Sequence, residues 1–441
     1  MPLRHPAFEV READWLSVGE AVARVLDAAR PLPTENLPLD DVAGRVLGEP
    51  LVARATLPPW DNSAMDGYAV RGEDVGGATR TNPVRLEMRG DVRAGETPDG
   101  AVGRGQAIRI MTGAPMPPGA DAVVPVEETD GEAEQAGVVA IRVGAEPGRN
   151  VRPGGQDVKA GEKVLSSGTT ITPGVLAVLA ALGHATIPVV RRPRIAILSS
   201  GDELRSIEDF SDVIDGKGVP EVNGPALLAA VRACGARGVG LGIARDDEQH
   251  IRQRIEASFG SDLLVTSGGA SMGEADLFKR VLDTMGFTLD FWRVKIRPGS
   301  PISFGWIRRD DVDLPVLGLP GNPSSAFVTF QIFARPMILR MAGHRRVHRR
   351  VIAATAAEPL KSTPRLTHFH RVTLGGGPGA RTVRLAGHPG SGLIRSIGAA
   401  DALAVVPEGI ALIQEGERVG VILLDDGPGA SESLDYETGL E

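Results

Sequence analysis

The stretch that decides the fold is Asp262-Leu-Leu-Val-Thr266, which is followed by Ser267-Gly-Gly-Ala-Ser-Met-Gly273 and then by Leu277-Phe-Lys-Arg-Val-Leu282. This order predicts a strand, a glycine-rich turn and a helix. Glycine lets backbone N–H groups come close to a ligand, and the first turn of a helix adds unpaired donors and a favourable dipole. The turn is therefore typical of an anion site, although it matches neither common nucleotide-binding motif.

The same order of strand, polar loop and helix recurs on both sides of this stretch. Strand-like runs at 195–198, 238–243 and 314–319 each lead into a loop rich in glycine, proline or polar residues. Strands that alternate with helices predict a doubly wound, mostly parallel sheet, in which ligands bind at the carboxyl ends of the strands. The loops at these ends are therefore expected to converge on one crevice.

The flanking segments predict further domains. An amphipathic helix is expected at 15–30, with Ser17 and Glu20 as a capping box, a second short helix at 37–48, and a buried apolar helix at 173–183. Short β-type runs among dense Gly and Pro predict small β-domains. The expected bounds are 12–48 and 150–190 for a discontinuous linking domain, 49–149 for an inserted β-rich domain, 191–340 for the central α/β domain, 345–425 for a C-terminal β-domain and 426–441 for an acidic tail.

Composition narrows the class of protein. The 441 residues are 42% hydrophobic and carry a formal net charge of −8, which disfavours a nucleic-acid-binding protein. No apolar run is long enough to span a bilayer, and the first residues do not resemble a signal peptide. The single cysteine, Cys234, excludes an intrachain disulfide framework and is expected to be packed. A cytoplasmic protein is expected.

Acidic side chains gather in two places, each with two interpretations. Asp61-Asn-Ser-Ala-Met-Asp-Gly-Tyr-Ala-Val70 is a candidate site, or a turn stabilised by Asx side chains. Glu203 and Asp246 are candidate ligands, or caps of helix N-termini. Because these two acids and Asp276 all follow strands of one predicted sheet, they are candidate Mg²⁺ ligands. Mg²⁺ usually needs only one or two carboxylates besides substrate phosphate.

Basic residues and histidines alternate in two segments. Arg293, Lys295 and Arg297 alternate and so are expected to share one face of a strand, either as a solvated edge or as a row of cations for a phosphorylated ligand. His368 and His370 also alternate on a predicted strand. They show no metal-ligand spacing and are predicted to be ordinary surface histidines.

Six stretches stand in a characteristic order and at characteristic separations. They are Asp61-Asn-Ser-Ala-Met-Asp-Gly-Tyr-Ala-Val70, Arg109-Ile-Met-Thr-Gly-Ala-Pro115, Gly201-Asp-Glu-Leu204, Ser267-Gly-Gly-Ala-Ser-Met-Gly-Glu-Ala-Asp276, Arg297-Pro-Gly-Ser-Pro301 and Leu319-Pro-Gly-Asn-Pro323. Together they closely resemble the molybdopterin molybdenumtransferase family, which comprises the MoeA proteins and the E domain of gephyrin. The resemblance covers about residues 15–424.

The resemblance implies the last step of molybdenum cofactor synthesis. Molybdate would be inserted into adenylylated molybdopterin, with Mg²⁺-dependent release of AMP. It also implies an elongated homodimer whose site lies in a cleft between subunits, with transient contacts to molybdopterin adenylyltransferase and to molybdoenzyme chaperones. A molybdopterin adenylyltransferase and a non-enzymatic molybdopterin-binding scaffold are the alternatives. The added β-domains disfavour the first, and the lack of a long partner-binding linker disfavours the second.

The resemblance also implies which residues form the site, and some positions depart from the family pattern. The implied residues are the catalytic acids Asp66, Asp157, Glu203, Asp246 and Asp276; the substrate-binding residues Thr112, Ser267, Gly268, Gly269, Ser271, Gly273, Arg293, Arg297, Pro320 and Pro323; and Arg371 and Ser391 as an oxyanion pocket for molybdate. Glu203, Asp246 and Asp276 are the implied Mg²⁺ ligands. Arg293, Arg297 and Ser300 stand where the family commonly has lysines, and Glu221 alters the surroundings of Asn223.

Overall fold

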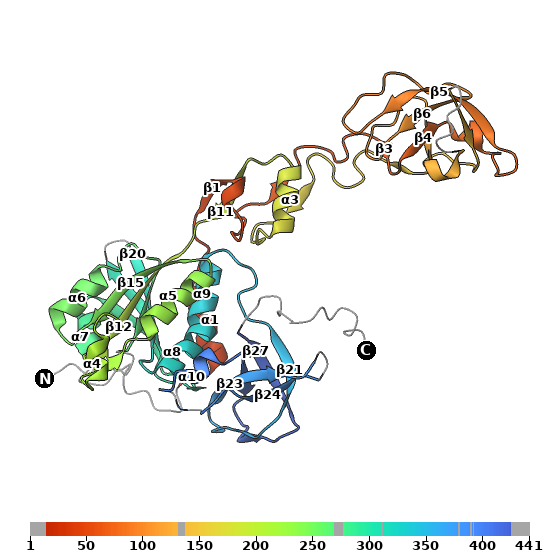
Figure 1. Cartoon of the computed structure of the whole chain (residues 1–441). Helices are drawn as coiled ribbons and strands as arrows, with labels where there is room; N and C mark the ends of the chain where they lie inside the picture. Colours follow the sequence, from red (N-terminus) through yellow and green to blue (C-terminus); the bar gives the residue numbers. More distant parts are fainter. Residues whose placement is uncertain are drawn as a thin grey trace.

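The computed structural model describes residues 15–130, 137–268, 277–309, 312–377, 380–388, 390 and 392–424. The chain is elongated (Figure 1). One β-domain lies at one end, a small linking domain lies in the middle, and the central α/β domain and the C-terminal β-domain pack together at the other end. No helix in the described part of the chain has the length and apolar character needed to cross a bilayer.

The central sheet has the strand order β15-β12-β16-β20-β19-β17. Four neighbouring strands are parallel: β15 (Arg237–Ala244), β12 (Arg194–Ser200), β16 (Leu263–Ser267) and β20 (Val312–Leu319). Strand β19 (Ser303–Arg309) pairs antiparallel with β20, and β17 (Phe287–Trp292) pairs antiparallel with β19. The predicted parallel core of the sheet is thus observed. All four parallel strands end at the same edge, as the sequence predicts.

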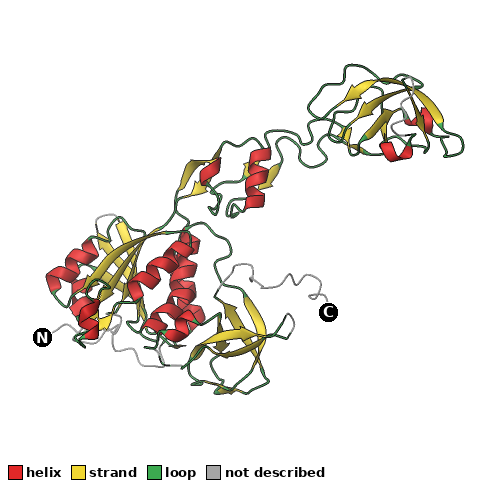
Figure 2. Ribbon diagram, in the orientation of Figure 1, coloured by secondary structure: helices red, strands yellow, loops and turns green. Residues whose placement is uncertain are grey.

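Helices cover both faces of this sheet (Figure 2). Because side chains alternate along a strand, Ile195 and Ile197 pack toward one helical layer, and Ala196 and Leu198 pack toward the other. The first layer holds α1 (Val18–Ala28), α5 (Asn223–Ala233), α8 (Pro323–Thr329), a π-helical segment (Phe330–Ala334) and α9 (Arg335–Met341); the second holds α6 (Glu248–Glu256) and α7 (Leu277–Thr284).

Helix α1 begins with the predicted capping box, because Glu20 N–H donates to Ser17 Oγ and Ser17 N–H donates to Glu20 Oε2 over 2.8 Å. Its buried residues Ala21 and Val25 pack into the core of the central domain, against α9. The assignment of 12–48 as a whole to the linking domain was therefore wrong for α1, whose apolar stripe completes the helical layer of the central sheet.

The linking domain pairs β1 (Thr34–Pro38) with β11 (Thr186–Val190), and β2 (Leu51–Val52) with β10 (Lys163–Leu165). The helix expected at 37–48 is wrong, because only a 3-10 turn forms at Leu39–Asp41. Residues 37–38 belong instead to β1, whose pairing with β11 overrides the local helical pattern.

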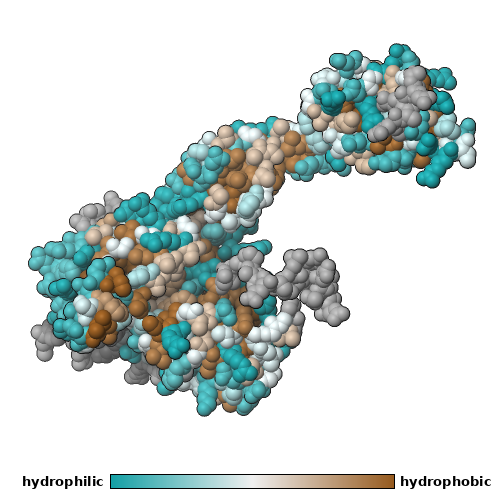
Figure 3. Space-filling model, viewed as in Figure 1, coloured by the Kyte–Doolittle hydropathy of each residue, from teal (hydrophilic) through white to brown (hydrophobic). Residues whose placement is uncertain are grey.

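Helix α3 (Pro173–Ala181) forms where the sequence predicts it, with Thr172 as N-cap, but it is not buried. Leu179 is its only buried residue, although the helix has no polar side chain. Figure 3 shows the resulting apolar patch over the linking domain. A helix that is apolar all round is normally covered, so this surface is available for an interface.

The inserted β-domain has the strand order β7-β4-β6-β5-β8 and two small apolar cores. Its strands are β4 (Gly67–Val70), β5 (Val84–Val92), β6 (Gln106–Ile110), β7 (Ala122–Pro125) and β8 (Val138–Ile141), and β3 (Asn62–Ser63) pairs with β9 (Val151–Arg152) beside them. The short β-type runs expected in this region, at 84–88, 107–111, 122–126 and 138–143, overlap β5, β6, β7 and β8. The hairpin loop expected at 130–137 falls largely outside the described residues.

The C-terminal domain closes on itself, because β23 pairs with both β24 and β25 while β21 and β27 complete the ring. These strands are β21 (Val351–Ala356), β23 (Thr367–Gly375), β24 (Thr382–Leu385), β25 (Ala402–Val406) and β27 (Arg418–Leu423). The short strand β18 (Ile296–Arg297), contributed by the central domain, pairs in parallel with β23. This pairing joins the two domains next to the predicted anion-binding residues.

Candidate functional site

The carboxyl ends of the central strands form one continuous edge. Ser267 at the end of β16 lies in register with Ser199 of β12 on one side and with Leu319 of β20 on the other. Gly268 follows with φ 89°, and a Cβ on it would lie 2.3 Å from the Ser200 carbonyl oxygen. Only glycine fits this close approach of two strand ends. The strand ends thus lie side by side, as predicted, but in the described part of the chain they do not open into one crevice: Gly201 and Asp246 line one cavity and Pro320 lines another.

Asn223 ties this edge together. Its Nδ2 donates to Ser267 Oγ over 2.6 Å and to the Gly321 carbonyl over 2.7 Å. Glu221, which departs from the family pattern, accepts at Oε1 from Ser199 Oγ over 2.9 Å and from Gly224 N over 2.6 Å. The altered surroundings of Asn223 therefore serve to fix the start of α5 against β12.

Three carboxylates gather at the ends of β12 and β15. Asp246 N–H donates to Asp202 Oδ1 over 2.9 Å, and the Glu203 carboxylate lies against Gly201, where a Cβ would be 2.5 Å from Glu203 Oε2. Burial, followed by the charges of Asp202 and Glu203, raises the pKa of Asp246. A bound cation would relieve this repulsion, so the donor set suits Mg²⁺.

This acidic cluster does not form a complete metal site by itself. Within the described ranges, no three His, Cys, Asp or Glu side chains are arranged to hold a metal. The predicted third ligand, Asp276, lies outside the described residues, as do the turn residues Gly269, Ser271 and Gly273. Two carboxylates with substrate phosphate remain a sufficient donor set for Mg²⁺.

A cavity of about 970 Å³, here called the cationic cavity, opens between the central and C-terminal domains. The central domain contributes Arg297 and Pro320, and the C-terminal domain contributes Lys361 and Arg371. The structure thus brings together three of the predicted residues, Arg297, Pro320 and Arg371, from positions far apart in the chain. Lys361, which was not predicted as a site residue, adds a cation to the cavity wall.

Arg371 is the most buried cation of this cavity, with 6% of its surface exposed. Its Nε donates to Ser396 Oγ over 2.9 Å, and an Nη atom donates to the Gly390 carbonyl over 3.4 Å. Burial lowers the pKa of Arg371. No carboxylate among the described residues pairs with it. The predicted partner Ser391 lies outside the described residues, and Ser396 is the hydroxyl that contacts the guanidinium.

The prediction that His368 and His370 are surface residues is wrong. His368 is buried and both rings line the cavity, with ring centroids 5.6 Å apart. Burial, with the charges of His370 and Arg297, lowers the pKa of His368 to about 4, and burial lowers the pKa of His370 as well. Neutral rings therefore line the wall at neutral pH. Both histidines lie on β23, the strand that also carries Arg371, and the sequence does not show that this part of the strand is covered by another domain.

Two buried polar atoms of this cavity have no hydrogen-bond partner among the described residues. These are Nε2 of His370 and Oγ of Ser362. Buried polar atoms normally have hydrogen-bond partners. These two atoms lie in the same cavity as the Arg371 guanidinium, for which no carboxylate partner is described, so the cavity has room for the polar groups of a ligand. The cations give the cavity a preference for an anion.

The prediction that Arg293, Lys295 and Arg297 share one face of a strand is wrong. Strand β17 ends at Trp292, and Arg293 has φ 71°, which breaks the alternation before β18. The Arg293 guanidinium stacks over Trp292, 4.2 Å from the ring centroid, and also lies over Trp15. Only Arg297 of this group lines the cavity. Cation–π stacking on aromatic rings gives Arg293 a structural role.

Asp66 and Thr112 contact each other in the inserted β-domain. Asp66 Oδ1 accepts from the N–H and from Oγ1 of Thr112, each over 2.7 Å, and these bonds lower the pKa of Asp66. Asp157 is exposed beside the strand-like segments that lead to this domain, and its N–H donates to the Leu57 carbonyl. Figure 1 places this domain far from the central sheet. One chain alone does not bring these residues to Glu203 and Asp246.

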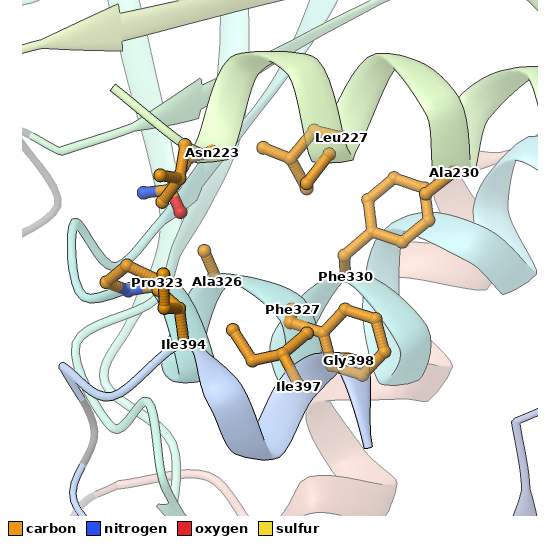
Figure 4. A pocket seen from close by; sticks show the side chains of 12 residues that line it. Asn223, Leu227, Ala230, Pro323, Ala326, Phe327, Phe330, Ile394, Ile397 and Gly398 are labelled. Carbon is orange, nitrogen blue, oxygen red and sulfur yellow. The ribbon is translucent and has the colours of Figure 1, made fainter. Parts of the chain in front are cut away.

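A separate, apolar pocket of about 210 Å³ lies among α5, α8 and α10 (Arg395–Gly398), as Figure 4 shows. Leu227, Phe327, Phe330 and Ile397 form much of its wall, and Pro323 lies at one end beside Asn223. The wall carries no charged side chain. This pocket therefore has no group that would bind an anion. Pro323 lines it and does not line the cationic cavity.

Comparisons with known proteins agree with this architecture over nearly the whole chain. Residues 16–183 match the MoeA N-terminal region (domain I and II), residues 196–340 match the probable molybdopterin binding domain, and residues 353–424 match the MoeA C-terminal region (domain IV). A crystal structure of the molybdopterin biosynthesis MoeA protein from Pyrococcus horikoshii superposes with a TM-score of 0.80 at 28% identity, and covers 93% of this chain and 100% of that one.

The central domain and the cavities beside it thus define a multidomain protein of the molybdopterin-binding class. Molybdopterin molybdenumtransferase 2 of Mycobacterium tuberculosis is 38% identical over 406 residues, which is 91% of this chain and 96% of that protein. Molybdopterin molybdenumtransferase of Bacillus subtilis is 32% identical over 417 residues, covering 94% and 95%. This chain belongs to the molybdopterin molybdenumtransferase family, and it is an enzyme of molybdenum cofactor biosynthesis.

Proposed function

We propose that this enzyme inserts molybdate into adenylylated molybdopterin and releases AMP in a Mg²⁺-dependent hydrolysis. The observation that carries the proposal is the buried Arg371 guanidinium, which has no carboxylate partner among the described residues and lines a cavity with Arg297 and Lys361. An uncompensated buried cation favours an anionic ligand, because pairing offsets the cost of burying the charge. Molybdate is such an anion.

The geometry of Arg371 supports the binding of a tetrahedral oxyanion. A guanidinium has five N–H donors, and among the described residues Arg371 donates through Nε to Ser396 and through one Nη to Gly390. Its other N–H groups would donate to molybdate oxygens. Ser362 Oγ, which has no partner among the described residues, would supply another donor in the same cavity. Arg371 would hold the oxyanion, with Arg297 and Lys361 raising the local positive potential.

The acids at the other strand ends would serve the phosphate chemistry. Glu203 and Asp246 would hold Mg²⁺ together with substrate phosphate, and Asp276 is proposed as a third ligand. Bound there, Mg²⁺ would neutralise the charge that develops on phosphate oxygens. The glycine-rich turn that follows β16 is proposed to support the pyrophosphate with backbone N–H groups. Cations for molybdate and acids for Mg²⁺ thus occupy separate parts of the site.

A homodimer would complete the site. Asp66 and Thr112 lie in a domain far from Glu203 and Asp246 along the elongated chain (Figure 1), so we infer that a second copy supplies them across a cleft. The apolar surface of α3 supports self-association, because only Leu179 of that helix is buried within its own chain. The twofold symmetry usual for dimers would create two equal clefts.

The test is an assay with adenylylated molybdopterin, Mg²⁺ and molybdate, in which AMP release is followed with and without molybdate. The proposal predicts that AMP release depends on molybdate. A molybdopterin adenylyltransferase would instead consume ATP in the presence of free molybdopterin. A binding scaffold would retain the adenylylated compound without turnover, and either of these results would overturn the proposal.

A further inference from the structure

A separate cavity of about 620 Å³ lies at the opposite edge of the central sheet, where the linking domain joins it. Five arginines and one acid line it: Arg191, Arg192, Arg194, Arg232, Arg237 and Glu35. The arginines come from three places, namely the segment that leads into β12, the end of α5 and the start of β15. The candidate active site uses the carboxyl ends of the same strands, so this cavity is distinct from it.

The two acids at this cavity are each paired with one arginine. Asp262 forms two bonds with the lining residue Arg191, over 3.1 and 2.7 Å, and also accepts from the Arg194 backbone N–H over 2.7 Å. The lining residue Glu35 accepts from Arg45 Nη2. The side chains of the other four lining arginines, Arg192, Arg194, Arg232 and Arg237, form no ion pair with a described residue. The cavity therefore carries a local excess of positive charge in a chain whose net charge is −8.

The arrangement places like charges side by side. Arg194 and Arg237 are register partners on the neighbouring strands β12 and β15, so their side chains leave the sheet on the same face. Like charges in directly opposite positions destabilise a sheet unless an anion lies between them. Arg232 has a local reason for its charge, because it stands in the last turn of α5, where the helix dipole favours a cation. Arg194 and Arg237 have no such reason.

The floor of the cavity leaves room for a ligand. Ala236, Gly238 and Gly260 contribute little or no side chain to its lining, and none of its lining residues is aromatic. Guanidinium groups pair with phosphate through two parallel hydrogen bonds, and several of them suit a ligand that carries several phosphates. The cavity has no aromatic ring for a nucleobase, and its guanidinium groups are expected to pair with phosphates.

We propose that this cavity binds a di- or triphosphate group, recognised through its phosphates alone. This site goes beyond the insertion of molybdate and does not depend on it. Free inorganic polyphosphate and the phosphate chain of a nucleotide share this chemistry. Binding is electrostatic at exposed side chains, so it weakens as salt rises.

The test is calorimetric titration of the full-length protein with tripolyphosphate at low and at physiological salt. We expect the double variant Arg194→Gln/Arg237→Gln to bind about tenfold more weakly or worse, because charge-assisted hydrogen bonds are lost. The matched control is Arg85→Gln/Arg104→Gln, which removes the same charge from exposed positions of the inserted β-domain and is expected to bind as the unchanged protein does.

Two further arms decide the outcome. ATP should bind within a few-fold of tripolyphosphate; a much tighter fit for ATP would contradict recognition through phosphates alone. Molybdate-dependent AMP release should persist in the Arg194→Gln/Arg237→Gln variant, which separates this site from the proposed active site. Equal affinity in the double variant and the unchanged protein, or equal loss in the control, would overturn the proposal.

Discussion

Arg371 and Ser396 form a hydrogen bond of 2.9 Å from Nε to Oγ inside the C-terminal domain, and both residues are buried. The bond orients the guanidinium, and no carboxylate among the described residues pairs with it. A buried cation without an anionic partner reduces stability. Arg371 lines the same cavity as Arg297 of the central domain, which is where we propose that the oxyanion binds.

Replacing Arg371 tests the oxyanion pocket. We expect Arg371→Ala to raise the molybdate concentration required for AMP release by about 10- to 100-fold, because charge-assisted hydrogen bonds contribute about 1.5–3 kcal/mol. Arg371→Lys should be intermediate, since an ammonium cannot form the same fork of bonds. The control is Arg384→Ala on the exposed side of β24. An unchanged molybdate dependence in Arg371→Ala would contradict this role.

His368 should make the stability of the C-terminal domain depend on pH. Its pKa falls from 6.5 to about 4 on folding, so the unfolded chain binds more protons between these values. The contribution to stability is therefore complete above about pH 6.5, is lost as pH falls toward 4, and amounts to roughly 3 kcal/mol at most. NMR titration of the His368 ring should show a midpoint near the lower value.

The matching control for this pH effect is His368→Gln. Thermal unfolding of the unchanged protein should shift downward between pH 7.5 and pH 5 by more than that of the variant. A ring that titrates at the value of a free histidine would show that the cavity wall is hydrated and would contradict the buried placement.

Replacing Gly268 by a larger residue should reduce both the stability and the activity of the protein. Gly268→Ala puts a Cβ 2.3 Å from the Ser200 carbonyl oxygen at φ 89°. Gly242→Ala is the control, because Gly242 has φ 74° and nothing within 4 Å of an added Cβ. Both share the cost of about 1–2 kcal/mol for a positive φ, and only Gly268→Ala adds a clash between strand ends. A larger fall in melting temperature is expected for Gly268→Ala, together with loss of AMP release.

Mixing two inactive variants tests the composite site. If the Asp66–Thr112 pair of one chain completes the acids of another, Asp66→Ala and Asp246→Ala should each be inactive as homodimers. After mixing and exchange of subunits, half of the dimers would each hold one intact cleft, which restores about a quarter of the activity. No recovery in dimers shown to be mixed would place all the residues in the cleft of one chain.

The sequence predicted the fold best where local pattern and packing agree. The alternation of Ile195 with Ala196 in β12 reflects two helical layers, and the capping box of Ser17 and Glu20 starts α1 where expected. The pattern at 37–48 failed because the pairing of β1 with β11 joins residues about 150 positions apart, and such pairing can override local propensity.

The cationic cavity could be predicted only in part. Arg371 and Arg297 followed from the family resemblance, whereas His368 and His370 were missed because alternation along a strand does not say which face is covered by another domain. The covering comes from β18, which adds to the edge of β23 and places Arg297 in register with His368. The prediction for Arg293 failed because its φ of 71° interrupts the strand after Trp292, and its guanidinium stacks over the Trp292 ring.

Molybdate insertion at Arg371 is tested by a single reaction in which AMP released and molybdenum bound to the pterin are quantified together, with the unchanged enzyme and with Arg371→Ala. We expect one AMP for each molybdenum incorporated by the unchanged enzyme, and a parallel loss of both in the variant at low molybdate. AMP release that proceeds at the same rate without molybdate, or incorporation that does not change in Arg371→Ala, would contradict the proposed function.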